Sequence, residues 1–180
     1  MYYSRKYKCP LGDILLVSDE KNIIGLWFND HKYMDKKLPD NIIENEDNPP
    51  LEKGLIWLED YFSGKKPEIS SLPISPINAT DFRKEVWEIL LEIPYGQLTT
   101  YGYIAKEVGK RIGKDKMSAQ AVGGAVGNNP ISIIIPCHRV VGLNGNLTGY
   151  GGGINRKIDL LTHEGVDMNK LFIPKYSSAP

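Results

Sequence analysis

One stretch decides how the fold is read, namely Ile131-Ser132-Ile133-Ile134-Ile135-Pro136-Cys137-His138-Arg139-Val140-Val141. Its apolar run predicts a buried strand that ends at Cys137, with a histidine and an arginine directly behind the thiol. A thiol is a useful nucleophile only as the thiolate, and nearby positive charge lowers its pKa. Buried cysteines are also common as inert core residues, so the pattern alone leaves Cys137 either reactive or structural.

The rest of the composition bounds the class of protein. The 180 residues, of which 41% are hydrophobic and 24% charged with a net charge of zero, suit a globular chain of one large or two small domains. No apolar stretch approaches the length of a membrane span, and the N-terminus lacks the apolar core of a secretory signal, so we expect no membrane partner. The second cysteine, Cys9, is far from Cys137, and the three histidines show no zinc spacing. We therefore expect a cytoplasmic protein with neither disulfide nor metal.

Upstream of this stretch, the chain divides into two parts. Apolar runs over residues 7–29, with a polar turn between 13–18 and 22–28, predict strands that include a hairpin. A charged surface loop over 30–50 and a helix over 51–62 follow. Prolines 67, 73 and 76 then mark the domain boundary, which predicts domains over residues 1–75 and 76–180.

Short helices dominate the second part. Thr80 or Asp81 is expected to cap a helix through Leu91, a second helix begins at 99–101, and Ser118 caps a third, made of small residues, over 119–126. The last two resemble a helix-turn-helix, and small residues suit either a helix on DNA or one packed tightly on a neighbour. The basic run between these two helices is either a solvated loop or an edge that contacts phosphates; it comprises Lys106, Lys110, Arg111, Lys114 and Lys116.

Three features follow the cysteine. Asn144-Gly145 is a tight-turn signal for a hairpin or wing, and Tyr150 lies in a glycine-rich loop that suits a lid over a flat ligand. Asn155 is expected to cap a final helix that ends near Glu164, which is either an exposed acid or a carboxylate that orients His138. Neighbouring side chains of a straight strand point to opposite faces, so a pair of thiol and imidazole needs a bend or a bridging water.

The order of these motifs resembles one family. Pro136-Cys137-His138-Arg139-Val140 is similar to the active-site signature of the O6-alkylguanine-DNA alkyltransferases, also called methylated-DNA–protein-cysteine methyltransferases. The resemblance covers residues 81–166 closely and residues 1–75 loosely. It rests further on Ile93-Pro94-Tyr95-Gly96, Thr99-Thr100-Tyr101, Ala121-Val122-Gly123-Gly124-Ala125, Asn129-Pro130, Thr148-Gly149-Tyr150 and Leu160-Leu161-Thr162-His163-Glu164-Gly165. It implies an α+β protein with a ribonuclease-H-like N-terminal α/β domain and a helical, winged-helix-like C-terminal domain that contains the helix-turn-helix.

The resemblance also implies a reaction. Cys137 would take the alkyl group, mainly methyl, from an O6-alkylguanine flipped out of double-stranded DNA, once per molecule. His138 would accept the thiol proton through a water, and Glu164 would polarise the imidazole. Tyr101 would donate a proton or hydrogen bond to the departing guanine, and Asn129 would brace the turn at the site. The reaction needs no cofactor, and we expect a monomer.

The resemblance assigns the binding residues as well. The expected walls of the guanine pocket are Gln120, Pro130, Val140, Tyr150 and Gly151. The expected contacts to DNA are Thr100, Tyr101, Ser118, Ala119, Gln120, Ala121, Gly123 and Arg139. Two positions depart from the family pattern. Gln120 stands where many members have an arginine that enters the space of the flipped base, and Gly151 replaces a small side chain that carries a hydroxyl.

Three other interpretations remain at this stage. A non-enzymatic relative that binds alkylated DNA would have another residue in place of Cys137. A cysteine hydrolase would need an oxyanion hole and would leave the helix-turn-helix unexplained. A helix-turn-helix regulator would use Cys137 structurally or as a redox sensor.

Overall fold

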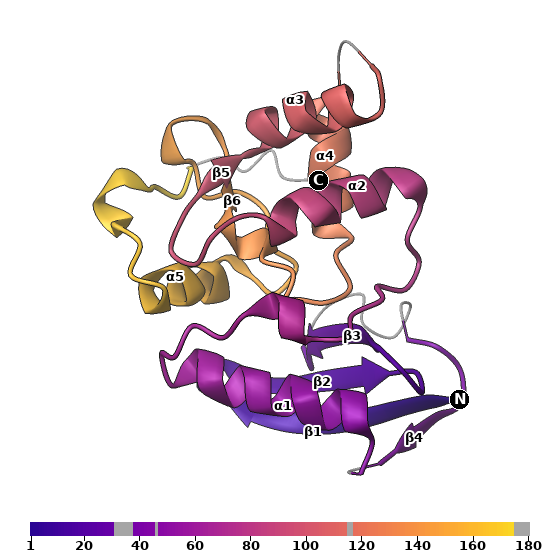
Figure 1. Cartoon of the computed structure of the whole chain (residues 1–180). Helices are drawn as coiled ribbons and strands as arrows, with labels where there is room; N and C mark the ends of the chain where they lie inside the picture. The colour runs from indigo at the N-terminus through magenta and orange to yellow at the C-terminus, as the bar shows by residue number, and fades with distance from the viewer. Residues whose placement is uncertain (31–37, 46, 115–116, 175–180) are drawn as a thin grey trace. The chain divides into compact units, whose positions relative to one another are not determined.

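The structure is a computed structural model, and it describes residues 1–30, 38–45, 47–114 and 117–174. The chain divides into two compact units, residues 1–78 with 130–134, and residues 79–129 with 135–180 (Figure 1). The first unit contains β1 (Tyr2–Cys9), β2 (Gly12–Ser18), β3 (Ile23–Phe28), β4 (Ile42–Glu44) and α1 (Pro49–Phe62). The second contains α2 (Asp81–Leu91), β5 (Thr99–Thr100), α3 (Tyr101–Arg111), α4 (Ala119–Gly127), β6 (Val140–Val141) and α5 (Ile154–His163).

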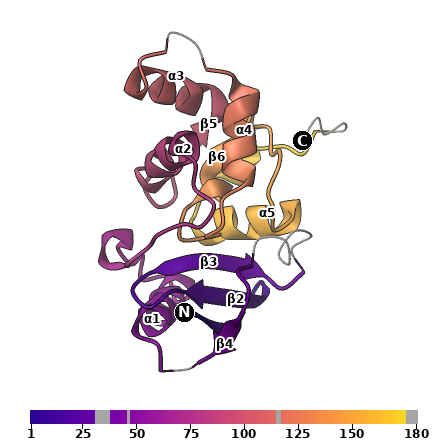
Figure 2. The same ribbon diagram turned by 90° about the vertical axis from the view of Figure 1, so that its right-hand side faces the viewer.

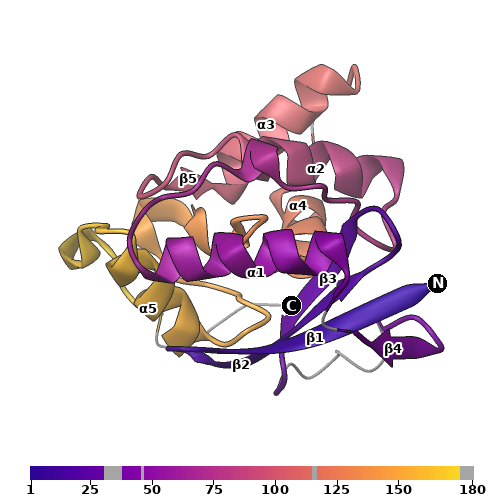
Figure 3. The same ribbon diagram turned by 60° about the horizontal axis from the view of Figure 1, so that its bottom comes forward.

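The first unit is a four-stranded sheet in the order β3-β2-β1-β4, with β4 parallel to β1 and the other pairs antiparallel. The predicted hairpin is confirmed as β2 and β3, whereas β1 begins at Tyr2, earlier than expected. Helix α1 lies across one face of the sheet (Figure 3). Gly54 permits this close approach, because a Cβ there would meet Ile23 and Leu16 side-chain carbons at 2.8 Å.

The second unit packs three short helices, α2, α3 and α4, against one another (Figure 2). Their N-termini follow the sequence prediction, because Thr80, Thr100 and Ser118 each accept hydrogen bonds from backbone N–H groups of the first turn. The Trp87 indole donates to the Ala125 carbonyl at 2.9 Å and so joins α2 to α4. The second unit therefore holds α3 and α4 as the pair that resembles a helix-turn-helix.

The predicted strand before Cys137 is wrong. Residues 132–134 form a turn and residue 135 a bend, and the Ile134 N–H donates to the Ser132 carbonyl at 2.8 Å. Ile133 has a φ of 69°, a left-handed conformation that interrupts an extended strand. Only the start of the segment pairs with the sheet, where Leu26 exchanges hydrogen bonds with Pro130 and Ser132. A short apolar run cannot be told from a buried irregular segment by periodicity alone.

Two smaller predictions have mixed outcomes. The predicted turn at Asn144 and Gly145 forms, with positive φ at both residues and a hydrogen bond of 2.7 Å from the Gly142 N–H to the Asn146 carbonyl across it, whereas β6, just before it, pairs in parallel with β5. Helix α5 starts at Ile154 after Gly153, so Asn155 lies within its first turn and is not its cap. Part of the predicted surface loop, residues 31–37 and 46, and Lys116 of the basic run lie outside the described residues.

Candidate active site

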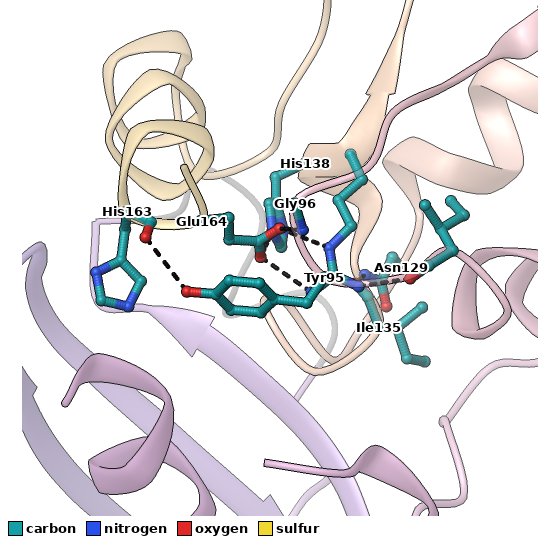
Figure 4. Close-up of polar contacts among 9 residues, drawn as sticks. Tyr95, Gly96, Asn129, Ile135, His138, His163 and Glu164 are labelled. Atoms are coloured by element: carbon teal, nitrogen blue, oxygen red, sulfur yellow. Dashed lines mark hydrogen bonds and ion pairs between the residues drawn. The ribbon is translucent and has the colours of Figure 1, made fainter. Parts of the chain in front are cut away.

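The thiol of Cys137 lies at the start of a short 3-10 helix, Cys137–Arg139, and its residue is only 7% exposed. The side-chain amide of Asn129, which follows α4, donates to the Ile135 carbonyl at 2.8 Å (Figure 4). The same amide donates to Cys137 Sγ at 3.1 Å. One amide thus braces the turn and places a donor on the sulfur. A donor on sulfur favours the thiolate over the thiol. The structure brings Asn129 and Cys137 together, as the sequence analysis expected.

The imidazole of His138 is wholly buried, and its Nε2 lies 2.7 Å from Glu164 Oε1 at the end of α5 (Figure 4). Burial lowers the pKa of His138 and outweighs the opposing effect of Glu164, so the ring is neutral near pH 7. With a carboxylate beside Nε2, the neutral ring carries its proton there, and Nδ1 is the acceptor. This Nδ1 is buried and has no hydrogen-bond partner among the described residues. The histidine therefore presents one unsatisfied basic nitrogen.

Glu164 is the centre of a buried ionic cluster. Besides His138, it accepts two hydrogen bonds from the Arg139 guanidinium, at 2.8 and 3.0 Å, and one from the Gly96 N–H at 3.0 Å. Burial alone would raise the pKa of Glu164, but the hydrogen bond from His138 and the pairing with Arg139 hold it well below its usual range. The carboxylate is therefore charged throughout the neutral range.

The position of Arg139 bears on its expected role at DNA. Its residue is 3% exposed, and its third polar contact is a hydrogen bond of 2.6 Å to the Ile93 carbonyl. A guanidinium held by a carboxylate and a carbonyl in the interior has no reach to a phosphate. We therefore correct the assignment of Arg139 from a contact to DNA to a structural partner of Glu164. The buried cluster explains why a basic residue directly follows the histidine.

One residue of the site escaped the sequence analysis. Lys157 of α5 is buried, and its Nζ donates to the carbonyls of Val140 at 2.6 Å and Thr148 at 2.9 Å. Burial lowers its pKa to about 8, and interaction with Cys137 partly opposes this shift. The sequence did contain a signal, because Lys157 lies three residues after Ile154 and four before Leu161, on the apolar stripe of the helix.

Two tyrosines lie near these groups. The Tyr101 hydroxyl, at the start of α3, donates to the Thr148 carbonyl at 3.4 Å, so Tyr101 and Lys157 share one acceptor. Burial, with a smaller contribution from Cys137, raises the pKa of Tyr101 to about 12, so its hydroxyl keeps its proton. The Tyr150 ring meets the His138 ring edge to face at 6.5 Å between centroids.

The remaining predicted residues fall into two groups. Ser118, Ala119, Gln120 and Ala121 are exposed at the start of α4, whereas Thr100 and Gly123 are half-buried. Gly151 is exposed in the loop after Tyr150, and the buried Val140 contributes the carbonyl that Lys157 binds. Pro130 follows Asn129 directly in the chain, and its expected place in the wall of the guanine pocket stays a prediction. It groups with the first unit, where its carbonyl accepts from the Leu26 N–H.

Part of the basic run lines an open hollow between α3 and α4, of about 710 Å³. Its charged lining residues are Lys106, Lys110 and Lys114, and glycines 102, 109 and 113 also line it. Lys110 is paired with Glu107 at 2.7 Å, whereas Arg111 pairs with Glu92. Among the described residues, no three His, Cys, Asp or Glu side chains are placed to hold a metal ion. No helix in the described part of the chain is long and apolar enough to cross a membrane.

Comparison with known proteins places this geometry in a family. Residues 81–166 match the DNA binding domain of 6-O-methylguanine DNA methyltransferase, and residues 1–76 match its ribonuclease-like domain. The chain belongs to the 6-O-methylguanine DNA methyltransferase family. Methylated-DNA–protein-cysteine methyltransferases from Haemophilus influenzae and Methanosarcina acetivorans are 41% and 42% identical to it. These alignments cover 91% and 92% of this chain and 86% and 99% of the relatives, respectively.

Solved structures agree with this placement. The O6-methylguanine methyltransferase of Mycobacterium tuberculosis is 36% identical, with a TM-score of 0.78 over 91% of this chain and 93% of that one. A structure described as Mycobacterium tuberculosis OGT in complex with DNA gives the same identity and TM-score over 90% and 92% of the two chains. The expected α+β fold, with a ribonuclease-like domain and a DNA-binding domain, is therefore confirmed.

Proposed function

We propose that this methyltransferase repairs double-stranded DNA by moving the alkyl group of O6-alkylguanine irreversibly onto Cys137. The observation that carries the proposal is the buried pair of His138 and Glu164, directly next to a cysteine that accepts a hydrogen bond from Asn129. Relatives are named for transfer from methylated DNA to a protein cysteine, and one related structure contains DNA. A thiol beside a neutral base and an orienting carboxylate is the arrangement of an activated nucleophile.

The proposed step is an in-line displacement at the alkyl carbon. The thiol proton passes through a water to Nδ1 of His138, whose Nε2–H is held by Glu164. The bond from Cys137 Sγ to carbon forms as the bond from carbon to O6 breaks, and guanine leaves with a proton or hydrogen bond from the Tyr101 hydroxyl. The proton that His138 took from the thiol then returns to Tyr101, if the hydroxyl gave up its own, or passes to the guanine. Atoms and electrons balance without a cofactor. The thioether is stable, so each molecule reacts once.

Base flipping supplies access, because the alkyl group cannot be reached inside the base stack. The exposed start of α4 is the proposed contact to DNA, and Gln120 is the side chain that would fill the space of the flipped base. Gln120 can hydrogen-bond to the orphaned cytosine, but it lacks the charge and stacking of an arginine. We expect the lysines along the hollow between α3 and α4 to contact flanking phosphates. One molecule suffices for this geometry, so we propose that the monomer is active.

The proposal is tested by intact mass. After incubation with duplex DNA that contains O6-methylguanine, the wild-type chain is expected to gain the mass of one methylene group, and Cys137→Ala is expected to gain none. Unmodified DNA of the same sequence is the control. Continued demethylation without an adduct would instead indicate a hydrolase, and DNA binding without reaction would indicate a regulator. Either result would contradict the proposal.

A further inference from the structure

We infer that Tyr95 is a positioning residue for the reacting cysteine. Its hydroxyl holds the end of α5 directly before Glu164, and its ring holds Arg139, which binds the Glu164 carboxylate. The inference rests on the proposed function for one point alone, that the alkyl group comes from O6-alkylguanine. The contacts that carry it lie within the second unit, and Figure 4 shows the hydrogen bonds from Tyr95 to His163 and from Gly96 to Glu164. None of the roles given above to Cys137, His138 or Glu164 involves Tyr95.

The backbone around Tyr95 is a tight turn between α2 and β5. The Gln97 N–H donates to the Pro94 carbonyl at 3.1 Å, and Gly96 has a φ of 74°, which is the pattern of a type II turn with glycine at its third position. The turn touches the end of α5. The Gly96 N–H donates to Glu164 Oε2, and a Cβ at Gly96 would meet the Glu164 carbonyl oxygen at 2.8 Å.

The Tyr95 side chain adds two contacts. Its hydroxyl donates to the carbonyl of His163, the last residue of α5, at 3.2 Å. The final carbonyls of a helix have no partner within the helix, so this hydrogen bond satisfies one of them and fixes the helix end directly before Glu164. The Tyr95 ring lies 5.7 Å from the guanidinium carbon of Arg139, within the range of a cation–π interaction.

These contacts converge on one carboxylate. Tyr95 holds the backbone before Glu164 and the arginine that binds both of its oxygens, while the neighbouring Gly96 binds the carboxylate directly. A short hydrogen bond from His138 to Glu164 requires that Oε1 stay in place, because such bonds weaken steeply with distance and angle. Loss of Tyr95 should therefore loosen Glu164 and make His138 a weaker base towards the thiol.

The measurement must distinguish a loss of positioning of Glu164 from a general loss of the stability of the protein. The titratable or charged groups around Cys137 and His138 are Glu164, Arg139 and Lys157, with Tyr101. Burial and the charge of Glu164 raise the pKa of Tyr95, so its hydroxyl keeps its proton in the neutral part of the assay. A change in the pH profile of thiol reactivity between wild type and a Tyr95 variant therefore reports on the base, because Lys157, whose pKa of about 8 also falls in the range of the assay, is common to all of these proteins.

The experiment measures the rate at which iodoacetamide alkylates Cys137 in the full-length chain, from about pH 6 to about pH 10, with the modified peptide identified by mass. Tyr95→Phe keeps the ring over Arg139 and removes the hydroxyl, and Tyr95→Leu removes both contacts. At pH 7 we expect Tyr95→Phe to slow alkylation by about threefold to tenfold, the range of one lost hydrogen bond, and Tyr95→Leu to slow it further. The midpoint of the profile should move to higher pH, and the rates should converge with wild type where the thiol ionises unaided.

The matched control is Leu171→Ala. Leu171 packs against the cluster of Val141, Leu147 and Leu161, so its truncation should lower stability without moving the midpoint. Tyr95 variants that lose stability as Leu171→Ala does, but keep the wild-type midpoint, would overturn the inference. The assay contains no DNA, so a failure of the proposed repair reaction would leave this result readable and would be recognised separately by the absence of methyl transfer.

Discussion

Glu164→Gln tests the buried cluster most severely, because it removes one charge and changes almost no volume. In the wild type, the side chains of Glu164 and Arg139 are 0% and 4% exposed and share two hydrogen bonds. Removing one partner of a buried ion pair costs about 3–5 kcal/mol, because the other charge stays buried and uncompensated. Against a typical total of about 5–15 kcal/mol, the variant should fold but with a large part of its stability lost.

The pH dependence of this loss has a defined sign. The pKa of Glu164 is depressed in the folded state, so its contribution is present above the pKa of an unfolded glutamate and is lost as the pH falls through the folded value. The difference in unfolding free energy between wild type and Glu164→Gln should therefore be constant from pH 7 to about pH 5. It should shrink below about pH 4.3, where an unfolded glutamate becomes protonated.

The assays are urea unfolding at each pH and single-turnover methyl transfer at pH 7. A neutral amide cannot support the charge that develops on His138, so transfer should slow by about a hundredfold or more. Asp159→Asn, an exposed change on the same helix, is the control and should alter stability by less than about 0.5 kcal/mol. A Glu164→Gln variant with wild-type stability and wild-type transfer rate would refute the role of the cluster.

Three further predictions concern single positions. Lys157→Met removes the cation near Cys137, which favours the thiolate, and should therefore move the pH midpoint of thiol alkylation upward. An unchanged midpoint would show that Lys157 does not stabilise the thiolate. The pKa of Lys157 is 10.5 in the unfolded chain and about 8 in the folded one, so the wild-type free energy of unfolding should increase as the pH rises from about 8 to 10.5. Denaturant unfolding of Lys157→Met should show no such increase. Gln120→Arg should strengthen DNA binding at raised salt and steepen its salt dependence in a titration, and unchanged affinity and repair rate would contradict the proposed role of Gln120. Gly96→Ala should lower the free energy of unfolding by about 1–3 kcal/mol, because it forces a side chain into the left-handed region against Glu164; a wild-type urea midpoint would contradict this.

Local chemistry explains which parts of the fold could be predicted. Ser118 was predicted as a cap, Thr80 was one of two candidates, and the helix start at 99–101 was placed correctly, because a cap is formed by a side chain and backbone groups two or three residues away. The segment before Cys137 was mistaken for a strand, since its isoleucines report burial but not backbone conformation. The left-handed φ of Ile133 cannot be read from a β-branched residue.

The residues of the candidate site also divide into those that the sequence indicated and those that only the fold brings together. The residue types beside Cys137 indicated a thiol with a base, and the resemblance to a family supplied Asn129 and Glu164 in their roles. The partnership of Arg139 with Glu164 was not predicted, because it joins residues 25 positions apart through a contact that only the fold creates. Lys157 was missed for a related reason: a lysine on an apolar stripe is usually assumed to extend to solvent.

The central claim is that Cys137 is the acceptor and acts once. The most direct measurement is methyl transfer from an excess of duplex DNA containing O6-methylguanine, followed to its plateau and located by peptide mass. We predict a plateau at one methyl group per molecule, all of it on the peptide that contains Cys137 and none on Cys9. Continued release of repaired DNA beyond that stoichiometry, or a methyl group found on Cys9 instead, would contradict it.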